Sequence, residues 1–310
     1  MRASCKFCIM HSSHEKHRAN FLKLLGDLLE FAGMTMKICV LGAGVIGLTT
    51  AWLLSERGHE VTIVDRAAMS GAGASAANGA QLSYAFLTPL ACPENLWALP
   101  ALLAARDGPM RLRAGWDPDF VRWGLQFLCQ CSARAVTQTL VAQAALATLS
   151  RAELTRLTEL LGLEFGLQTA GKLVIYRQQR AFQKAWASAR LNAHLEQQVL
   201  SAVDCLVLEP ALRLKVQDFV GGIVTPSEQV GDRAVFCAEI TARLQQRTGV
   251  TLLLDTAVIG PFVKNGRLVA VQTAVGEMSA DAFVLSLGAQ SSRFARACGF
   301  RLPVVPMKGY

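Results

Sequence analysis

Apolar runs and a helical pattern alternate in the region that begins at Met36. Residues 38–41 are continuously apolar, as expected of a strand buried on both faces of a parallel sheet. Residues 48–57 combine apolar and polar positions as a helix does, and Gly58 is expected to end this helix. Residues 60–64 form a second apolar run, which ends at an acidic residue. The pattern therefore predicts a β-α-β unit at the start of this region.

A second α/β block is predicted towards the end of the chain. Residues 233–247 have a helical pattern, followed by an apolar strand at 250–254. Residues 267–271 and 277–279 are expected to pair as antiparallel strands around Gly276. An apolar strand at 282–287 then runs into a glycine. We expect this block to join the first β-α-β unit in one sheet, so that the domain is discontinuous.

The segment between these blocks is predicted to form a second domain of the α+β type. The 310 residues suit two domains, at about 150 residues per domain. The expected division is 36–83 with 231–301 for the first domain and 84–230 with 302–310 for the second. Within the second domain, helices are predicted at 120–131, 136–161 and 178–194, and strands at 171–176 and 221–224.

Residues 1–35 are expected to be an N-terminal extension, either disordered or carrying one amphipathic helix. Phe21, Leu24, Leu25, Leu28 and Leu29 recur at helical spacing. A zinc site is the alternative for the residues spaced three apart, which are Cys5, Cys8, His11, His14 and His17. Three-residue steps turn steadily around a helix, so all five side chains cannot meet. We therefore predict no metal site.

Composition and charge exclude several classes of protein. Hydrophobic residues make up 52% and charged residues 17%, which excludes a disordered chain. No apolar run reaches the roughly 18 residues of a spanning helix without an interruption. The net charge of +8 is scattered, which favours small anions or an anionic surface over nucleic acid. The nine irregularly spaced cysteines indicate a reduced, cytoplasmic protein.

The turn after the first predicted strand carries the motif of a dinucleotide-binding site. Its residues are Gly42, Ala43, Gly44, Val45, Ile46 and Gly47. Gly42 permits the tight turn, Gly44 lets the backbone approach a diphosphate, and Gly47 lets the helix pack closely. The helix N-terminus offers free N–H groups to the phosphates. Asp65 follows the second strand, where a carboxylate can bind ribose hydroxyls, and Arg66 comes next.

A stretch of small residues at 71–83 favours FAD over NAD as the dinucleotide. A NAD domain would continue directly into a helix and a third strand, whereas glycine and alanine here permit close approach to a larger ligand. A short helix is expected from Ser75 or Ala76. Ser75, Asn78 and Gln81 are therefore candidate flavin-site residues. The alternative is a flexible loop without a ligand.

Two further candidates for cofactor contact lie in the second block. Val258 follows a strand and could place its backbone beside the adenine, or it could be an ordinary core residue. Gly288 ends the apolar strand at the carboxyl edge of the predicted sheet, where ligands bind in such folds. It could equally serve only as a turn.

Taken together, the motifs resemble the glycine oxidase and D-amino-acid oxidase group of FAD enzymes. Within that group they are most similar to the bacterial D-amino-acid dehydrogenases of the small-subunit type. The resemblance covers 36–310. Its motifs are the two strands with the glycine turn, Ser75-Ala76-Ala77-Asn78, Gly221-Gly222, Gly231-Asp232, Leu285-Ser286-Leu287-Gly288-Ala289 and Pro306-Met307-Lys308-Gly309-Tyr310.

The resemblance implies a Rossmann-like FAD-binding domain with an inserted substrate domain. It implies oxidative deamination of D-amino acids such as D-alanine, in which a hydride passes from the substrate Cα to flavin N5 and water hydrolyses the imine. It also implies a quinone-type electron acceptor and a place at the inner face of the cytoplasmic membrane. Tyr84, Lys308 and Tyr310 are weak candidates for the substrate pocket, and no catalytic residue is assigned.

The chain stops where members of this group continue, so the substrate domain is expected to be incomplete and the protein truncated. Three alternatives to a D-amino-acid dehydrogenase remain open. One is another amine-oxidising flavoenzyme of the glycine, sarcosine or proline type. Another is an NAD-dependent dehydrogenase, which the small-residue stretch disfavours. The last is a non-catalytic fragment without a ligand.

Overall fold

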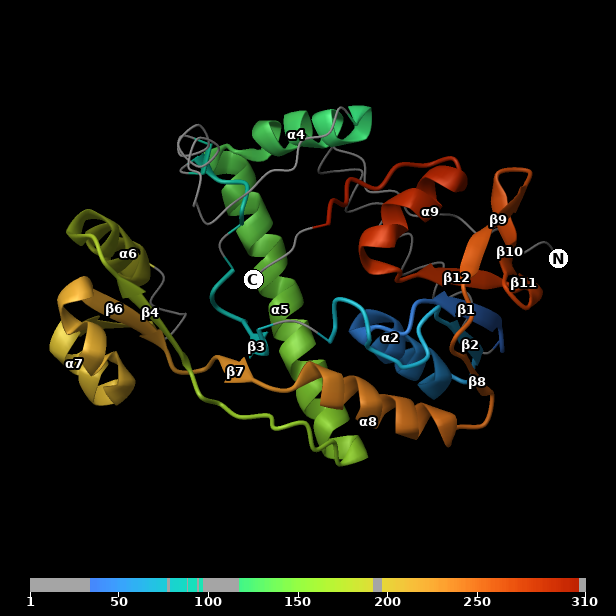
Figure 1. The fold of residues 1–310 in the computed structure, drawn as a ribbon, viewed down its shortest axis with the longest axis horizontal. Helices are drawn as coiled ribbons and strands as arrows, with labels where there is room; N and C mark the ends of the chain where they lie inside the picture. Colours follow the sequence, from blue (N-terminus) through green and yellow to red (C-terminus); the bar gives the residue numbers. More distant parts are fainter. Residues whose placement is uncertain are drawn as a thin grey trace. The chain divides into compact units, whose positions relative to one another are not determined.

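The computed structural model describes residues 34–76, 79–87, 89–93, 95–96, 117–191 and 197–306 (Figure 1). The chain divides into two compact units. Met1–Ala77 with Arg233–Tyr310 form the first, and Asn78–Asp232 form the second. The predicted N-terminal extension, with its cysteines and histidines, lies outside the described residues. Asn78, Lys308 and Tyr310 also lie outside them.

The first unit is built on a four-stranded parallel sheet, which confirms the predicted α/β class. Its strand order is β12 (Ala282–Leu285), β1 (Lys37–Leu41), β2 (Glu60–Val64) and β8 (Val250–Leu253). In the register, Cys39 lies opposite Thr62 on one side and Phe283 on the other. The β1 strand therefore lies in the interior of the sheet, as its unbroken apolar run predicts.

Two helices of the first unit pack together beside this sheet. They are α2 (Val45–Glu56) and α8 (Arg233–Gln245), and Leu48 and Ala51 of α2 are fully buried. Just beyond the end of α8, the guanidinium of Arg247 lies 4.5 Å from the ring centroid of Trp52 and donates a hydrogen bond to the carbonyl of Ser55 at 3.1 Å. These contacts fix the direction of α2, and therefore the position of its N-terminus.

A smaller antiparallel sheet in the first unit consists of β9 (Val258–Lys264), β10 (Arg267–Thr273) and β11 (Gly276–Ser279). The pairing of β10 with β11 was predicted. The strand β9 was not predicted, because Gly260 and Pro261 interrupt the run of strand-forming residues. The η3 turn (Gly288–Gln290) and α9 (Ser291–Ala297) follow β12. A core cluster joins both sheets to α9 and consists of Cys39, Leu41, Val64, Leu268, Val271 and Phe294.

The second unit contains helices and two small antiparallel sheets. The larger sheet has the order β4 (Lys172–Tyr176), β6 (Gly221–Thr225) and β5 (Gln198–Ser201). The smaller one pairs β3 (Gln81–Leu82) with β7 (Gln229–Val230). The helical elements are α4 (Pro118–Gln130), α5 (Ala133–Leu161), α6 (Gln179–Leu191), α7 (Ala202–Leu208) and η2 (Pro210–Asp218).

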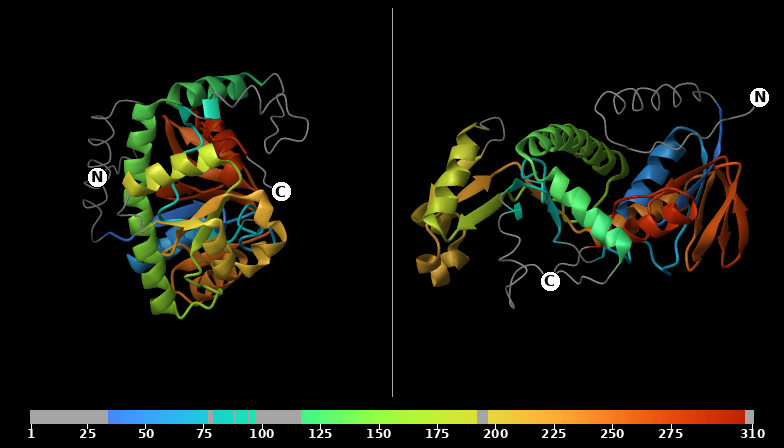
Figure 2. Two further views of the ribbon diagram at one scale, coloured as in Figure 1. Left: turned by 90° about the vertical axis from the view of Figure 1, so that its left-hand side faces the viewer. Right: turned by 90° about the horizontal axis from the view of Figure 1, so that it is seen from above.

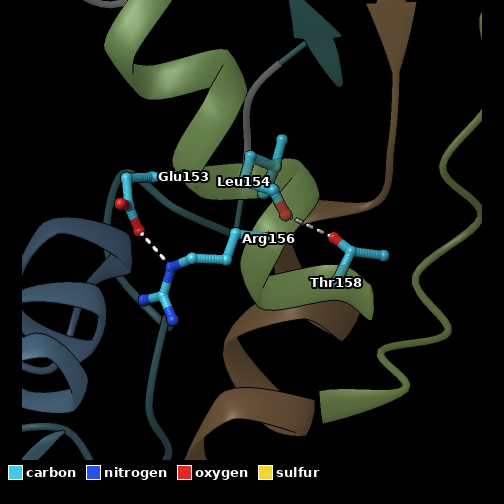
Figure 3. Close-up of polar contacts among 4 residues, drawn as sticks. All are labelled: Glu153, Leu154, Arg156 and Thr158. Carbon is cyan, nitrogen blue, oxygen red and sulfur yellow. Dashed lines mark hydrogen bonds and ion pairs between the residues drawn. The ribbon is translucent and has the colours of Figure 1, made fainter. Parts of the chain in front are cut away.

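Helix α5 is one continuous helix along its whole length (Figure 2). The hydroxyl of Ser132 caps its start by accepting a hydrogen bond from the N–H of Ala135 at 3.3 Å. Near its end, the guanidinium of Arg156 pairs with the carboxylate of Glu153 at 2.9 Å, and the Thr158 hydroxyl donates to the Leu154 carbonyl at 2.7 Å (Figure 3). Within the described ranges, neither α5 nor any other helix has the length and apolar character that a bilayer span requires.

Candidate functional site

The glycine motif forms a sharp turn from β1 into α2. Gly42 has a φ of 109°, a conformation that side chains disfavour, and its N–H donates to the carbonyl of Val64 at 2.8 Å. A Cβ added at Gly47 would lie 1.8 Å from the carbonyl oxygen of Gly42. Only glycine therefore fits at position 47 while the first turn of α2 lies this close to the strand.

The N-terminus of α2 offers hydrogen-bond donors. Gly44 is the N-cap and contributes no capping side chain. The N–H of Val45 donates to the hydroxyl of Ser75 at 3.1 Å. In the part of the chain that the structure describes, no acceptor is found for the N–H of Ile46 or Gly47. Free N–H groups at the positive end of a helix dipole suit the oxygens of a phosphate group.

The carboxylate of Asp65 lies against the same turn. One carboxylate oxygen accepts a hydrogen bond from the N–H of Ala43 at 2.7 Å, and the other accepts one from the N–H of Ala67 at 2.8 Å. Each oxygen of an ionised carboxylate has a second acceptor position. Asp65 is therefore held rigidly beside the phosphate turn and can still accept hydrogen bonds from ribose hydroxyls, while the neighbouring Arg66 is exposed.

A serine that the sequence analysis did not single out is hydrogen-bonded to the backbone of the glycine turn. The hydroxyl of Ser286, just after β12, donates to the carbonyl of Leu41 at 2.7 Å and lies 3.2 Å from the carbonyl oxygen of Gly42. It lies within the Leu285-to-Ala289 motif, but sequence alone does not show which strand its hydroxyl reaches.

Gly288 has a φ of 55°, and a Cβ there would meet no atom within 4 Å. Its backbone conformation, not close packing within the chain, accounts for the glycine.

The small-residue stretch folds back onto the glycine turn. The N–H of Gly71 donates to the carbonyl of Ala43 at 2.8 Å, and Ser75 contacts the start of α2 as described. The predicted helix does not start at Ser75 or Ala76. Both residues lie in a turn, and the N–H of Ala76 donates to the carbonyl of Gly73 at 3.0 Å. The glycine turn, Asp65 and Ser75 are thus brought together within the first unit.

Other predicted residues lie elsewhere. Val258 begins β9 opposite Thr273 and packs against the core cluster. Gln81 belongs to the second unit, where it pairs with Val230 in β3 and β7. Among the described residues, no group of histidine, cysteine or acidic side chains is arranged to hold a metal ion.

Tyr84 is fixed in the second unit by a buried glutamate that the sequence analysis missed. The Glu228 side chain is 2% exposed, and one of its carboxylate oxygens accepts hydrogen bonds from the N–H groups of Tyr84, Ala85 and Phe86 at 2.9, 2.7 and 3.3 Å. The Tyr84 hydroxyl bonds the side chain of Gln229 at 3.1 Å. Burial raises the pKa of Tyr84, because the charged form is poorly solvated there.

Two cations lie against this segment. The guanidinium of Arg151 is 5.2 Å from the ring centroid of Tyr84, and the ammonium of Lys172 is 4.0 Å from that of Phe86. The charge of Arg151 lowers the pKa of Tyr84 and that of Glu228 raises it, both less strongly than burial does. The phenol therefore stays protonated at neutral pH and acts as a hydrogen-bonding group in this unit.

Comparison with known proteins gives a consistent family relationship. The family model described as "DAO: FAD dependent oxidoreductase" matches residues 37–310. A protein named D-amino acid dehydrogenase 2 from Ralstonia nicotianae is 37% identical over 278 residues, which are 89% of this chain and 65% of that relative. A D-amino acid dehydrogenase from Agrobacterium fabrum is 33% identical over 277 residues, covering 89% of this chain and 66% of the relative. The chain thus spans slightly less than two thirds of the length of these relatives.

Solved structures share the fold. Glycine oxidase from Geobacillus kaustophilus superposes with a TM-score of 0.60 at 19% identity, over 86% of this chain and 60% of the oxidase. Iminodiacetate oxidase from Chelativorans sp. BNC1 superposes with a TM-score of 0.56 at 23% identity, over 87% of this chain and 60% of that protein. At such low identity the likeness establishes the architecture and not a substrate.

Proposed function

The chain belongs to the DAO family of FAD-dependent oxidoreductases, and from this premise we propose that it serves the oxidative deamination of D-amino acids to 2-oxo acids and ammonia. FAD is the cofactor of the family. One observation supports the proposal that FAD binds at this turn: the Asp65 carboxylate accepts a hydrogen bond from the N–H of Ala43 inside the glycine turn. An acid for the ribose and donors for the diphosphate are therefore parts of one rigid site.

Different residues of the site are proposed to bind different parts of FAD. The N–H groups of Ile46 and Gly47 receive the diphosphate, and the absence of a side chain at Gly44 leaves the backbone accessible. Asp65 binds the ribose hydroxyls of the adenosine half. Ser75 positions the start of α2. Arg66, Gln81, Val258 and Gly288 are further proposed contacts, as is Asn78, whose position lies outside the described residues.

When bound, FAD supplies the acceptor for a hydride from the Cα of the substrate. The protein has to orient the amino acid and to keep its amine neutral as the hydride leaves. Tyr84 is proposed as part of the substrate pocket because its phenol is protonated and its position is fixed by Glu228 and Gln229. Lys308 and Tyr310 are proposed only from the family motif.

The names of the relatives support the proposed substrate, and the quinone acceptor is proposed from the family resemblance. The curated relatives at 37% and 33% identity are called D-amino acid dehydrogenases, which favours a D-amino acid as the donor. A dehydrogenase passes electrons to an acceptor other than oxygen, and we propose a quinone at the inner face of the cytoplasmic membrane.

The test is reconstitution of the purified chain with FAD, followed by anaerobic addition of D-alanine. We expect a protein-bound flavin spectrum that D-alanine bleaches and L-alanine does not. Readmission of oxygen or addition of a soluble quinone then identifies the acceptor. Bleaching by glycine, sarcosine or proline alone would assign an amine oxidase of another specificity. Failure to retain flavin after gel filtration would contradict the proposed site.

A further inference from the structure

Arg233, the first residue of α8, lies beside the glycine turn with part of its charge unpartnered. Its Nε donates a hydrogen bond to the carbonyl of Ser75 at 3.2 Å. Its Nη2 is closed off from solvent and has no hydrogen-bond partner. No acidic side chain lies within ion-pair distance of Arg233 in the part of the chain that the structure describes. Among the described residues, this partly buried cation therefore has no counter-ion.

Ser75 connects this guanidinium to the N-terminus of α2. Its carbonyl accepts from Arg233, and its hydroxyl accepts from the N–H of Val45 at 3.1 Å. The same hydroxyl lies 3.3 Å from the position that a Cβ on Gly44 would take. Arg233 is thus linked through Ser75 to Val45, the residue directly before the donors Ile46 and Gly47 to which the diphosphate is assigned.

The position of Arg233 is unfavourable for the stability of the folded chain by itself. A cation in the first turn of a helix is repelled by the positive end of the helix dipole. A buried N–H group without an acceptor adds a desolvation cost. Burial raises the pKa of the Cys237 thiol, which lies one turn further along α8, and the charge of Arg233 lowers it. A bound anion would reverse the electrostatic part of this cost.

We infer that the positive charge of Arg233, which is linked through Ser75 to the start of α2, stabilises the bound diphosphate of FAD by electrostatic attraction through space. The inference rests on the proposed binding of FAD to the glycine turn. It assigns a positive charge that the glycine motif itself lacks, because the motif offers only neutral N–H groups. It also assigns a role to Arg233 that the sequence motif does not indicate.

The experiment compares Arg233→Met with a matched control in the same helix, Arg243→Met. Arg243 also has a buried nitrogen without a partner, its Nε, but it lies ten residues further on, about 15 Å along the helix axis. Affinity is measured by fluorescence titration with FAD and by thermal stabilisation with ADP and with adenosine. We expect Arg233→Met to weaken FAD and ADP binding about tenfold or more and to leave adenosine unchanged. Arg243→Met should bind all three ligands like the unsubstituted chain.

Two further readouts separate an electrostatic role of Arg233 from a structural one. The affinity of the unsubstituted chain for FAD should fall more steeply with salt than that of Arg233→Met, because salt screens the lost attraction. Arg233→Lys should recover part of the affinity. Equal losses for ADP and adenosine, or unchanged binding of FAD by Arg233→Met, would overturn the inference while leaving the FAD site intact. If the unsubstituted chain does not bind FAD, the proposed site itself fails, and the inference with it.

Discussion

The carboxylate of Asp65 accepts a hydrogen bond from the backbone N–H of Ala43 at 2.7 Å, which ties the end of β2 to the glycine turn after β1. Its other oxygen binds the N–H of Ala67 at 2.8 Å. One side chain thus fixes two backbone segments and leaves lone pairs for a ligand. The carboxylate therefore helps to hold the geometry of the turn.

Replacement of Asp65 should therefore lower both stability and FAD affinity. In Asp65→Asn, the amide NH₂ replaces one oxygen, so either Ala43 or Ala67 loses its acceptor, at a cost of about 1–3 kcal/mol. Asp65→Ala should cost more, because both N–H groups lose their acceptor. Urea unfolding and FAD titration measure the two effects. Unchanged FAD affinity in Asp65→Ala would contradict the assignment of Asp65 to the ribose.

Gly47→Ala should disrupt the turn between β1 and α2. The new Cβ would lie 1.8 Å from the Gly42 carbonyl oxygen and 2.8 Å from the Ser286 hydroxyl oxygen, so the helix must move away from the strand. Overpacking against backbone costs about 3 kcal/mol or more. Gly73→Ala is the matched control, since a Cβ there meets no atom within 4 Å. Thermal unfolding should show a large loss for the first variant and almost none for the control.

Glu228→Ala should destabilise the second unit strongly. Three backbone N–H groups at positions 84–86 would lose their acceptor in a buried environment, for a total of about 3 kcal/mol or more. Glu228→Gln keeps one carbonyl oxygen and should lose less. Glu209→Ala serves as the control, because Glu209 is exposed and accepts one N–H, from Ala211. Comparable losses in Glu228→Ala and Glu209→Ala would show that the three bonds contribute little.

Cys39 should make the stability of the first unit sensitive to alkaline pH. Burial raises the pKa of this thiol from 9.0 to about 11, so the folded state keeps its proton after the unfolded chain has lost it. The resulting stabilisation is complete below pH 9 and is lost as the pH rises from 9 towards 11, by about 3 kcal/mol in total. Cys39→Ala should lack this part of the alkaline decline, whereas the exposed Cys129→Ala should retain it. Urea unfolding between pH 8 and pH 10.5 provides the test.

Much of the fold follows from local pattern. The apolar runs that became β1, β2 and β12 and the glycine turn before α2 were recognisable because a buried parallel strand and a helix N-terminus each leave a short-range signal. The long helix α5 was likewise predicted to within a few residues. The strand β9 was missed because Gly260 and Pro261 break its alternation, and only its pairing with β10 identifies it.

The amino-acid sequence by itself determined the α/β class, the dinucleotide motif and the acid at position 65, because these depend on residues within one β-α-β unit. The tertiary structure alone decided which distant groups meet within each unit. Ser286 reaches the carbonyl of Leu41 across 245 positions, Arg233 reaches Ser75 across 158, and Glu228 reaches Tyr84 across 144. Such hydrogen bonds depend on strand order and side-chain direction, which leave no periodic trace in the sequence.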